Sequence, residues 1–357
     1  MRFSGFSLLL GSLALILSPA SAQEQADLPS APSAARTTKP APAPAQNPAP
    51  TPTPAPNENS APIADTSKSA PSPDLDPEGT TIRKNVNEVN IVFTVTDKHG
   101  RYVKDLKRAD FHVVDDNKPA NISSFHSETN LPLQVGLLVD ASNSVRDRFK
   151  FEQESAIEFL TQTVRPRYDK AFVVGFDATP EVTQDFTDNT ETLSRGVRIL
   201  KPGGGTAMYD ALYFACRDKL LKQPQGTPVR RAVILLSDGE DNLSHVTREE
   251  SIEMAQRAEV VVYTISTNVT GSRQRGDKVL QRIADATGGY AFFPFQITEV
   301  ANAFAEIQDE LRSQYALSYT PAEFHADGRY HTIEILASNR KSLRVRSRRG
   351  YYAPTAQ

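Results

Sequence analysis

The sequence predicts an α/β fold in which a doubly wound, mostly parallel sheet is inserted in a small antiparallel β-sandwich. Between residues 131 and 312, apolar strand segments alternate with amphipathic helical segments, the pattern of a sheet covered by helices on both faces. The segments on either side, 86–130 and 315–353, have a period of two instead. Each of these flanking segments is too short to bury a sheet face alone. We therefore expect the two to pair and form the sandwich.

Residues 1–22 have the pattern of an export signal. Arg2 precedes the apolar segment 6–17, and small residues at Ala20 and Ala22 fit a signal-peptidase site. An uncleaved anchor helix is the alternative, but about a dozen apolar residues fall short of the roughly 20 that span a bilayer. No later stretch is long and apolar enough to span a membrane. We expect a secreted or periplasmic protein, cleaved near Ala22, whose mature chain has no transmembrane segment.

Residues 23–80 are rich in Pro, Ala, Thr and Ser, as in the run 48–56. They lack the large apolar side chains that would offset the entropy of ordering, and their prolines favour polyproline II. We expect a disordered, semi-rigid linker here. The alternative is a ligand for a proline-binding module or a tether that crosses a cell wall.

Alternating apolar residues in the first flanking segment, Ile91, Phe93 and Val95, precede turn residues at 97–100. This pattern predicts strands with one face covered, and the second flanking segment repeats it. The strands expected in the two flanking segments are 91–96, 111–114, 122–125, 315–319, 331–336 and 343–348.

Between the flanking segments, the expected strands are 133–139, 171–176, 182–186, 232–236, 260–265 and 290–293. The expected helices are 146–164, 190–199, 207–222, 247–258, 277–287 and 298–312. The single cysteine, Cys216, shares helical spacing with Met208, Leu212 and Leu220, so we expect it in the core rather than at a reactive surface.

The chain is organised around Asp140, Ser142 and Ser144, which follow the apolar strand 133–139. Open α/β sheets bind ligands at the carboxyl ends of their strands, so these three oxygen ligands are expected at that edge. Carboxylate and hydroxyl oxygens suit a hard divalent cation, and we expect Mg²⁺, with Mn²⁺ or Ca²⁺ as alternatives. Helix capping by Asp140 or Ser144 is the structural alternative.

Two further loops, 203–206 and 237–241, lie at the ends of predicted elements. With them, the sequence resembles the von Willebrand factor type A family, whose metal-ion-dependent adhesion site (MIDAS) has the order Asp-x-Ser-x-Ser, then Thr, then Asp. The resemblance covers residues 131–312. The five positions that match the motif are Asp140, Ser142, Ser144, Thr206 and Asp238. Three other acids near these loops are expected to be solvated or to hydrogen-bond around the site, and are left outside it: Asp177, Asp210 and Asp241.

Beyond the motif, residues 86–353 resemble the secreted von Willebrand A-related proteins of Acidobacteria. The matching segments are 89–97, 105–111 and 349–352. This likeness implies the fold and the metal site, but it supplies no function for that group of proteins.

The resemblance implies that Ser142 and Ser144 bind the metal directly, and that Asp140, Thr206 and Asp238 bind it directly or through water. It also implies an open metal position that takes a carboxylate oxygen from an Asp or Glu of a protein partner. We therefore expect an exported, metal-dependent protein-binding or adhesion module. The alternative is a structural envelope protein, in which the metal only stabilises the loops and the β-sandwich or linker makes the contacts. The family likeness further suggests that the last helix, 298–312, shifts when metal coordination changes.

The sequence lacks the residues that several classes of enzyme require. Loop 203–207 has no P-loop lysine, and position 142 is Ser where a haloacid-dehalogenase-type phosphatase has its second Asp. The six histidines are dispersed, without the spacing of a zinc hydrolase. We expect no catalytic residues and no enzymatic activity. The net charge of -3 gives no indication of a nucleic-acid partner.

One basic stretch alternates arginines with other residues, so that a strand would present Arg344, Arg346 and Arg348 on one cationic face. A solvated edge that resists pairing with another sheet is one interpretation. Contact with an anionic cell-surface polymer is the other.

Overall fold

The computed structural model describes residues 88–127, 131–223, 229–268, 272–296, 298–338 and 342–355. All of them belong to one compact unit that spans Thr80–Gln357. The predicted export signal, 1–22, and the predicted linker, 23–80, lie outside the described residues. Within the described part of the chain, no helix has the length and apolar character needed to cross a membrane.

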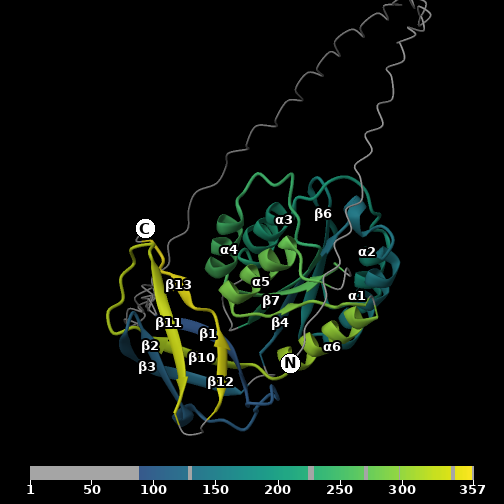
Figure 1. The fold of residues 1–357 in the computed structure, drawn as a ribbon. Helices are drawn as coiled ribbons and strands as arrows, with labels where there is room; N and C mark the ends of the chain where they lie inside the picture. Colours follow the sequence, from purple (N-terminus) through teal and green to yellow (C-terminus); the bar gives the residue numbers. More distant parts are fainter. Residues whose placement is uncertain are drawn as a thin grey trace, which may run out of the picture. The chain divides into compact units, whose positions relative to one another are not determined.

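The α/β region contains a six-stranded sheet in the order β6-β5-β4-β7-β8-β9, parallel except at its edge strand β6 (Figure 1). Its inner strands are continuous apolar runs because helices cover both of their faces. The strands are β4 (Leu133–Asp140), β5 (Lys170–Phe176), β6 (Pro180–Thr187), β7 (Arg230–Ser237), β8 (Val260–Ser266) and β9 (Ala291–Phe292).

Two hydrophobic cores, one on each face of this sheet, hold the helices. One core is formed with α1, α2 and α6, and the other with α3, α4 and α5 (Figure 1). Cys216 is fully buried in the second core, as predicted, and burial raises the pKa of its thiol. The helices are α1 (Phe149–Thr163), α2 (Thr190–Arg198), α3 (Met208–Phe214), which continues as a π-helical segment (Ala215–Leu220), α4 (Arg248–Arg257), α5 (Arg275–Thr287) and α6 (Glu299–Leu311).

The flanking segments pair with each other as predicted, but as one curved sheet and not as two distinct layers. Their strands share a single antiparallel sheet in the order β12-β1-β10-β3-β2-β11-β13, a half-barrel. A curled sheet encloses an aromatic core by itself, with Phe93 packed 5.0 Å from Phe111 and 5.5 Å from Tyr315, so no second layer is required. The strands are β1 (Val89–Thr96), β2 (Phe111–Asp115), β3 (Lys118–Ser127), β10 (Tyr315–Thr320), β11 (Tyr330–Ala337), β12 (Arg344–Ser347) and β13 (Gly350–Tyr352).

The predicted cationic face of Arg344, Arg346 and Arg348 does not form. Arg344 is exposed, but the Arg346 side chain forms an ion pair with Glu310 of α6. The Arg348 side chain is only 8% exposed, donates to the carbonyl of Asn90 at 2.6 Å and lies 3.2 Å from the carboxylate of Glu259. These two arginines serve internal contacts, because the acids of neighbouring elements face them.

Glu310 connects the end of α6 to both sheets. It is 1% exposed and accepts hydrogen bonds from Tyr263 of β8 and from Tyr102, each at 3.1 Å. Together with Arg346 of β12, these hydroxyls compensate a buried carboxylate, which would otherwise be costly. The last helix of the α/β region is therefore fixed to the half-barrel through one acidic side chain.

Candidate metal site

Asp140 ends β4 at the carboxyl edge of the sheet, with none of its surface exposed. Its Oδ2 accepts a hydrogen bond from Ser237 Oγ at 2.6 Å, and its Oδ1 accepts one from the Ser142 amide at 2.9 Å. Burial, and to a smaller extent the nearby charge of Asp238, raise the pKa of Asp140 to about 6 in spite of these hydrogen bonds, which lower it. The carboxylate is thus fixed in orientation and poorly compensated for its charge, as expected of a group that faces a cation.

Ser142 and Ser144 place their hydroxyls side by side, with 2.8 Å between the two Oγ atoms. Ser142 is buried and Ser144 is exposed, so the pair reaches from the interior to the surface. Neither hydroxyl caps α1, which begins at Phe149 and has Arg148 at its N-cap position. The capping alternative for Ser144 is therefore wrong, and the hydrogen bond between the two hydroxyls leaves oxygen lone pairs available to a cation.

The loop that carries Thr206 is held against the Asp140 loop by hydrogen bonds to and from its backbone. The Gly203 amide donates to the carbonyl of Ala141 at 2.7 Å, and the Asn143 side chain donates to the carbonyl of Gly204 at 3.2 Å. Gly204 has a φ of +72°, a left-handed conformation that glycine adopts without strain. Thr206 itself is buried.

The Asp238 loop closes on the Thr206 loop in turn. The Thr206 amide donates to the Asn242 side chain at 3.0 Å, and the Asn242 amide donates back to the Thr206 carbonyl at 3.0 Å. Gly239 has a φ of +80°, and a Cβ there would lie 2.3 Å from the carbonyl oxygen of Gly276, so only glycine fits. Hydrogen bonds therefore link all three loops and bring the five predicted residues to one edge of the sheet.

Ser237 has a role at this edge that sequence reasoning missed. Its hydroxyl donates to Asp140 and accepts from the Gly239 amide at 3.1 Å, so it links the β4 carboxylate to the next loop. Its only signal in the sequence is its position at the end of a buried strand, next to Asp238.

Two of the acids left outside the site hold its loops together. Asp241 accepts from the Tyr209 amide at 3.0 Å, at the start of α3, and from the Ser244 hydroxyl at 2.7 Å. Asp210 accepts from the amides of His245 and Val246, each at 2.9 Å. These acids join the helix after Thr206 to the loop after Asp238. The third acid, Asp177, accepts from the Thr179 amide at 3.3 Å.

A separate acidic cluster lies in the half-barrel and includes none of the five predicted residues. Asp115, Asp116 and His331 place one possible ligand atom each within 4.8 Å of one another. Hydrogen bonds account for these groups: Tyr319 donates to Asp115 at 2.6 Å, and the His331 ring lies 2.8 Å from Asp116. Asp327 contacts the other ring nitrogen of His331 at 3.3 Å.

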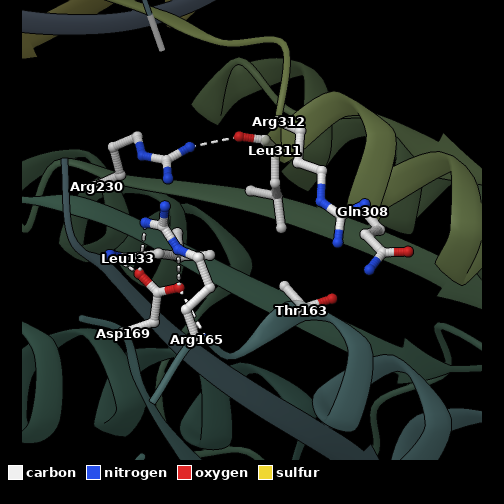
Figure 2. Close-up of a pocket in the computed structure, with 8 residues that line it drawn as sticks. All are labelled: Leu133, Thr163, Arg165, Asp169, Arg230, Gln308, Leu311 and Arg312. Carbon is white, nitrogen blue, oxygen red and sulfur yellow. Dashed lines mark hydrogen bonds and ion pairs between the residues drawn. The ribbon is translucent and has the colours of Figure 1, made fainter. Parts of the chain in front are cut away.

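A cavity of about 190 Å³ lies at the amino ends of the parallel strands, beside the first residues of β4 and β7. Figure 2 shows its lining residues, among which Asp169 pairs with Arg165 at 2.7 Å and Arg230 donates to the carbonyl of Leu311 at the end of α6. No predicted metal ligand lines it. Its lining residues are Leu133, Thr163, Arg165, Asp169, Arg230, Gln308, Leu311 and Arg312.

Part of the chain is similar to known proteins. The family model of the von Willebrand factor type A domain matches residues 135–240. Calcium-activated chloride channel regulator 1 of Bos taurus is 28% identical over 183 residues, which are 48% of this chain and 19% of that protein. The chain thus spans about a fifth of the length of this relative.

Solved structures with related folds are more distant. Proximal thread matrix protein 1 from the mussel byssus is 16% identical, with a TM-score of 0.45 over 56% of this chain and 51% of that chain. The same protein with a zinc-occupied MIDAS motif is 17% identical, with a TM-score of 0.45 over 54% and 48%. The domain of the type V pili tip protein Mfa5 from Porphyromonas gingivalis is 18% identical, with a TM-score of 0.42 over 51% and 95%.

Proposed function

We propose that this von Willebrand factor type A domain binds a divalent cation at the edge formed by Asp140, Ser142, Ser144, Thr206 and Asp238, and there captures an acidic side chain of a protein partner. The observation that carries the proposal is the hydroxyl pair of Ser142 and Ser144, 2.8 Å apart, next to a buried carboxylate that is held by two hydrogen bonds. Hydroxyl and carboxylate oxygens without a thiolate suit Mg²⁺, with Mn²⁺ or Ca²⁺ as alternatives.

The donor set explains why a partner would be needed. Ser142, Ser144 and Thr206 contribute no charge, so Asp140 and Asp238 are the only carboxylates among the five positions. When bound, the cation supplies a positive contact point for a further carboxylate oxygen. Ser144 is exposed, so this chain presents the site to solvent, where an Asp or Glu of another protein can reach it.

The alternative is a structural role, in which the cation only stabilises the loops of an envelope protein. The direct hydrogen bonds between the loops favour the binding role, because they already hold the Asp140, Thr206 and Asp238 loops together. Removing the cation should therefore leave the fold in place.

We further propose that the protein is exported and acts outside the cytoplasm as a binding or adhesion module without enzymatic activity. The support for export is the sequence pattern of residues 1–22.

Capture of envelope proteins by the immobilised protein tests the proposal. We expect partners to bind in Mg²⁺ and to be released by EDTA, and Asp140→Ala to abolish capture while its circular dichroism spectrum stays native. Glu240→Gln, which changes an exposed acid in the Asp238 loop, is the matched control and should bind as the wild type does. If Asp140→Ala unfolds, and EDTA does not release the partners captured by the wild type, the structural role is supported instead.

A further inference from the structure

Glu152 is a buried carboxyl group with no hydrogen-bond partner in the part of the chain that the structure describes. It lies in the first turn of α1, its side chain is 1% exposed, and both Oε atoms are buried and unpartnered. Buried polar groups in folded proteins almost always find a partner, and an exception needs an explanation such as a bound ion or water.

The neighbouring Arg148 does not supply that explanation. Its Nε lies 3.7 Å from Glu152 Oε1, which is longer than an N–H···O hydrogen bond, and this Nε also has no partner among the described residues. A buried ion pair without hydrogen bonds recovers little of the free energy lost when both charges leave water. A local structural ion pair is therefore an incomplete account of Glu152.

Electrostatics relates Glu152 to the metal-site loops. The pKa of Glu152 is raised to about 8: burial is the main cause, Arg148 opposes it, and the charges of Asp140 and Asp238 add to it. Those two acids come from β4 and from the loop after β7, so three carboxyl groups of different elements lie within electrostatic range of one another. Three carboxylates and one guanidinium leave two negative charges, which is the charge that one divalent cation balances.

We infer that Glu152 is a further acidic residue of the cation site, one that raises the affinity for a divalent cation through its buried charge and does not occupy one of the five ligand positions. This inference rests on the proposed function, since it needs a cation at Asp140. A residue that acts in this way balances the charge of the cation without binding it. Outer residues of this kind affect metal affinity in known metal sites.

Titration calorimetry with Mg²⁺ or Mn²⁺ alone, on EDTA-stripped protein at pH 8, tests the inference. We expect Glu152→Gln to weaken cation binding by about tenfold or more. Glu152→Asp keeps the charge and should retain most of the affinity. Glu154→Gln removes an exposed charge from the same helix and should bind as the wild type does. Thermal unfolding in EDTA shows whether each variant is folded, and Glu152→Gln should be at least as stable as the wild type there.

Three results are distinguishable. If the wild type binds no cation, or Asp140→Ala binds it equally well, the proposed function fails and the inference fails with it. If the wild type binds, Asp140→Ala does not, and Glu152→Gln binds as the wild type does, only the inference about Glu152 is overturned. If Asp140→Ala loses cation binding, Glu152→Gln loses affinity while staying folded, and Glu152→Asp and Glu154→Gln keep most of it, the inference holds.

Discussion

Ser237 Oγ donates a 2.6 Å hydrogen bond to Asp140 Oδ2, which joins the ends of two adjacent parallel strands, β4 and β7, at the candidate metal site. Both residues are fully buried. The bond fixes the orientation of Asp140, while the second carboxylate oxygen is held by the Ser142 amide. The precision of the site therefore depends on a residue outside the motif itself.

Ser237→Ala should lower both stability and cation affinity. Loss of a hydrogen bond to a buried charged group costs roughly 1.5–3 kcal/mol of unfolding free energy, and Asp140 becomes free to rotate. Urea unfolding and Mg²⁺ calorimetry measure the two effects. The matched control is Tyr319→Phe, which removes another 2.6 Å bond to a buried carboxylate, that of Asp115 in the half-barrel. It should cost stability and leave cation affinity unchanged; equal effects of both variants on affinity would contradict the assignment.

Cation affinity should rise with pH in two steps. Protons must leave Asp140, whose pKa burial raises to about 6, and Glu152, whose pKa burial raises to about 8, before their full charge faces a cation. Calorimetry between pH 5 and pH 9 should show the gain, because protons and cation compete. In Glu152→Gln the increase above pH 7 should disappear. A pH-independent affinity in the wild type would contradict this interpretation.

The cation-free protein should lose stability over the same range. Both acids have folded-state pKa values above their ordinary values, so the folded state binds more protons than the unfolded state between pH 4 and pH 8. Unfolding free energy in EDTA should therefore fall as the pH rises from 4.5 to 8, by an amount on the order of several kcal/mol. Saturating Mg²⁺ should reduce this loss, since it stabilises the ionised forms. A free energy of unfolding that increases with pH in EDTA would contradict this prediction.

The sequence predicts the strands of the α/β sheet well, because their signal is local. The run 133–139 is apolar throughout and ends on Asp140, so the end of the strand and the start of the site coincide in the sequence. The same holds for β7, which ends on Ser237 next to Asp238. Because parallel strands end at one edge of a sheet, recognising two such ends is enough to place the site.

The missed features depend on side-chain direction and on contacts between distant residues. Glu152 shares the helical spacing of the buried residues Phe149 and Ala156, but the sequence does not show that a charged side chain at this position stays buried without a hydrogen-bond partner. Arg346 and Arg348 do alternate along the chain, but their partners, Glu310 and Glu259, lie in other elements. The half-barrel also depends on contacts between distant residues. The alternation of apolar residues predicts which face of each strand is buried, but not whether the sheet curls over that face.

His331 should stabilise the half-barrel below pH 6.5 and lose this contribution as the pH rises. Burial lowers the pKa of His331, but the carboxylates of Asp116 and Asp327 raise it above its ordinary value overall. A raised folded-state pKa stabilises the fold while the ring is protonated, and the effect ends above that pKa. Because both acids are partly exposed, His331→Gln should cost about 1 kcal/mol or less at pH 5.5, and less still at pH 8.5. Urea unfolding at both pH values measures this, with the exposed His325→Gln as the control that should show no such difference.

Arg346→Gln should destabilise the protein far more than Arg344→Gln, although both change an arginine of β12. Arg346 pairs with Glu310, which is 1% exposed, so its loss leaves a buried carboxylate with only the hydroxyls of Tyr102 and Tyr263. Breaking one side of a buried pair costs about 3 kcal/mol, whereas a change at an exposed side chain such as Arg344 stays within about 0.5 kcal/mol.

Chemical denaturation of the two single variants and of Glu310→Gln combined with Arg346→Gln measures the difference. The double variant should recover part of the loss, because it leaves no uncompensated charge behind. If α6 and the half-barrel are fixed through this pair, Arg346→Gln should also increase hydrogen exchange at the end of α6 and in β12 together. Equal, small losses for Arg344→Gln and Arg346→Gln would show that Glu310 does not connect the two sheets energetically.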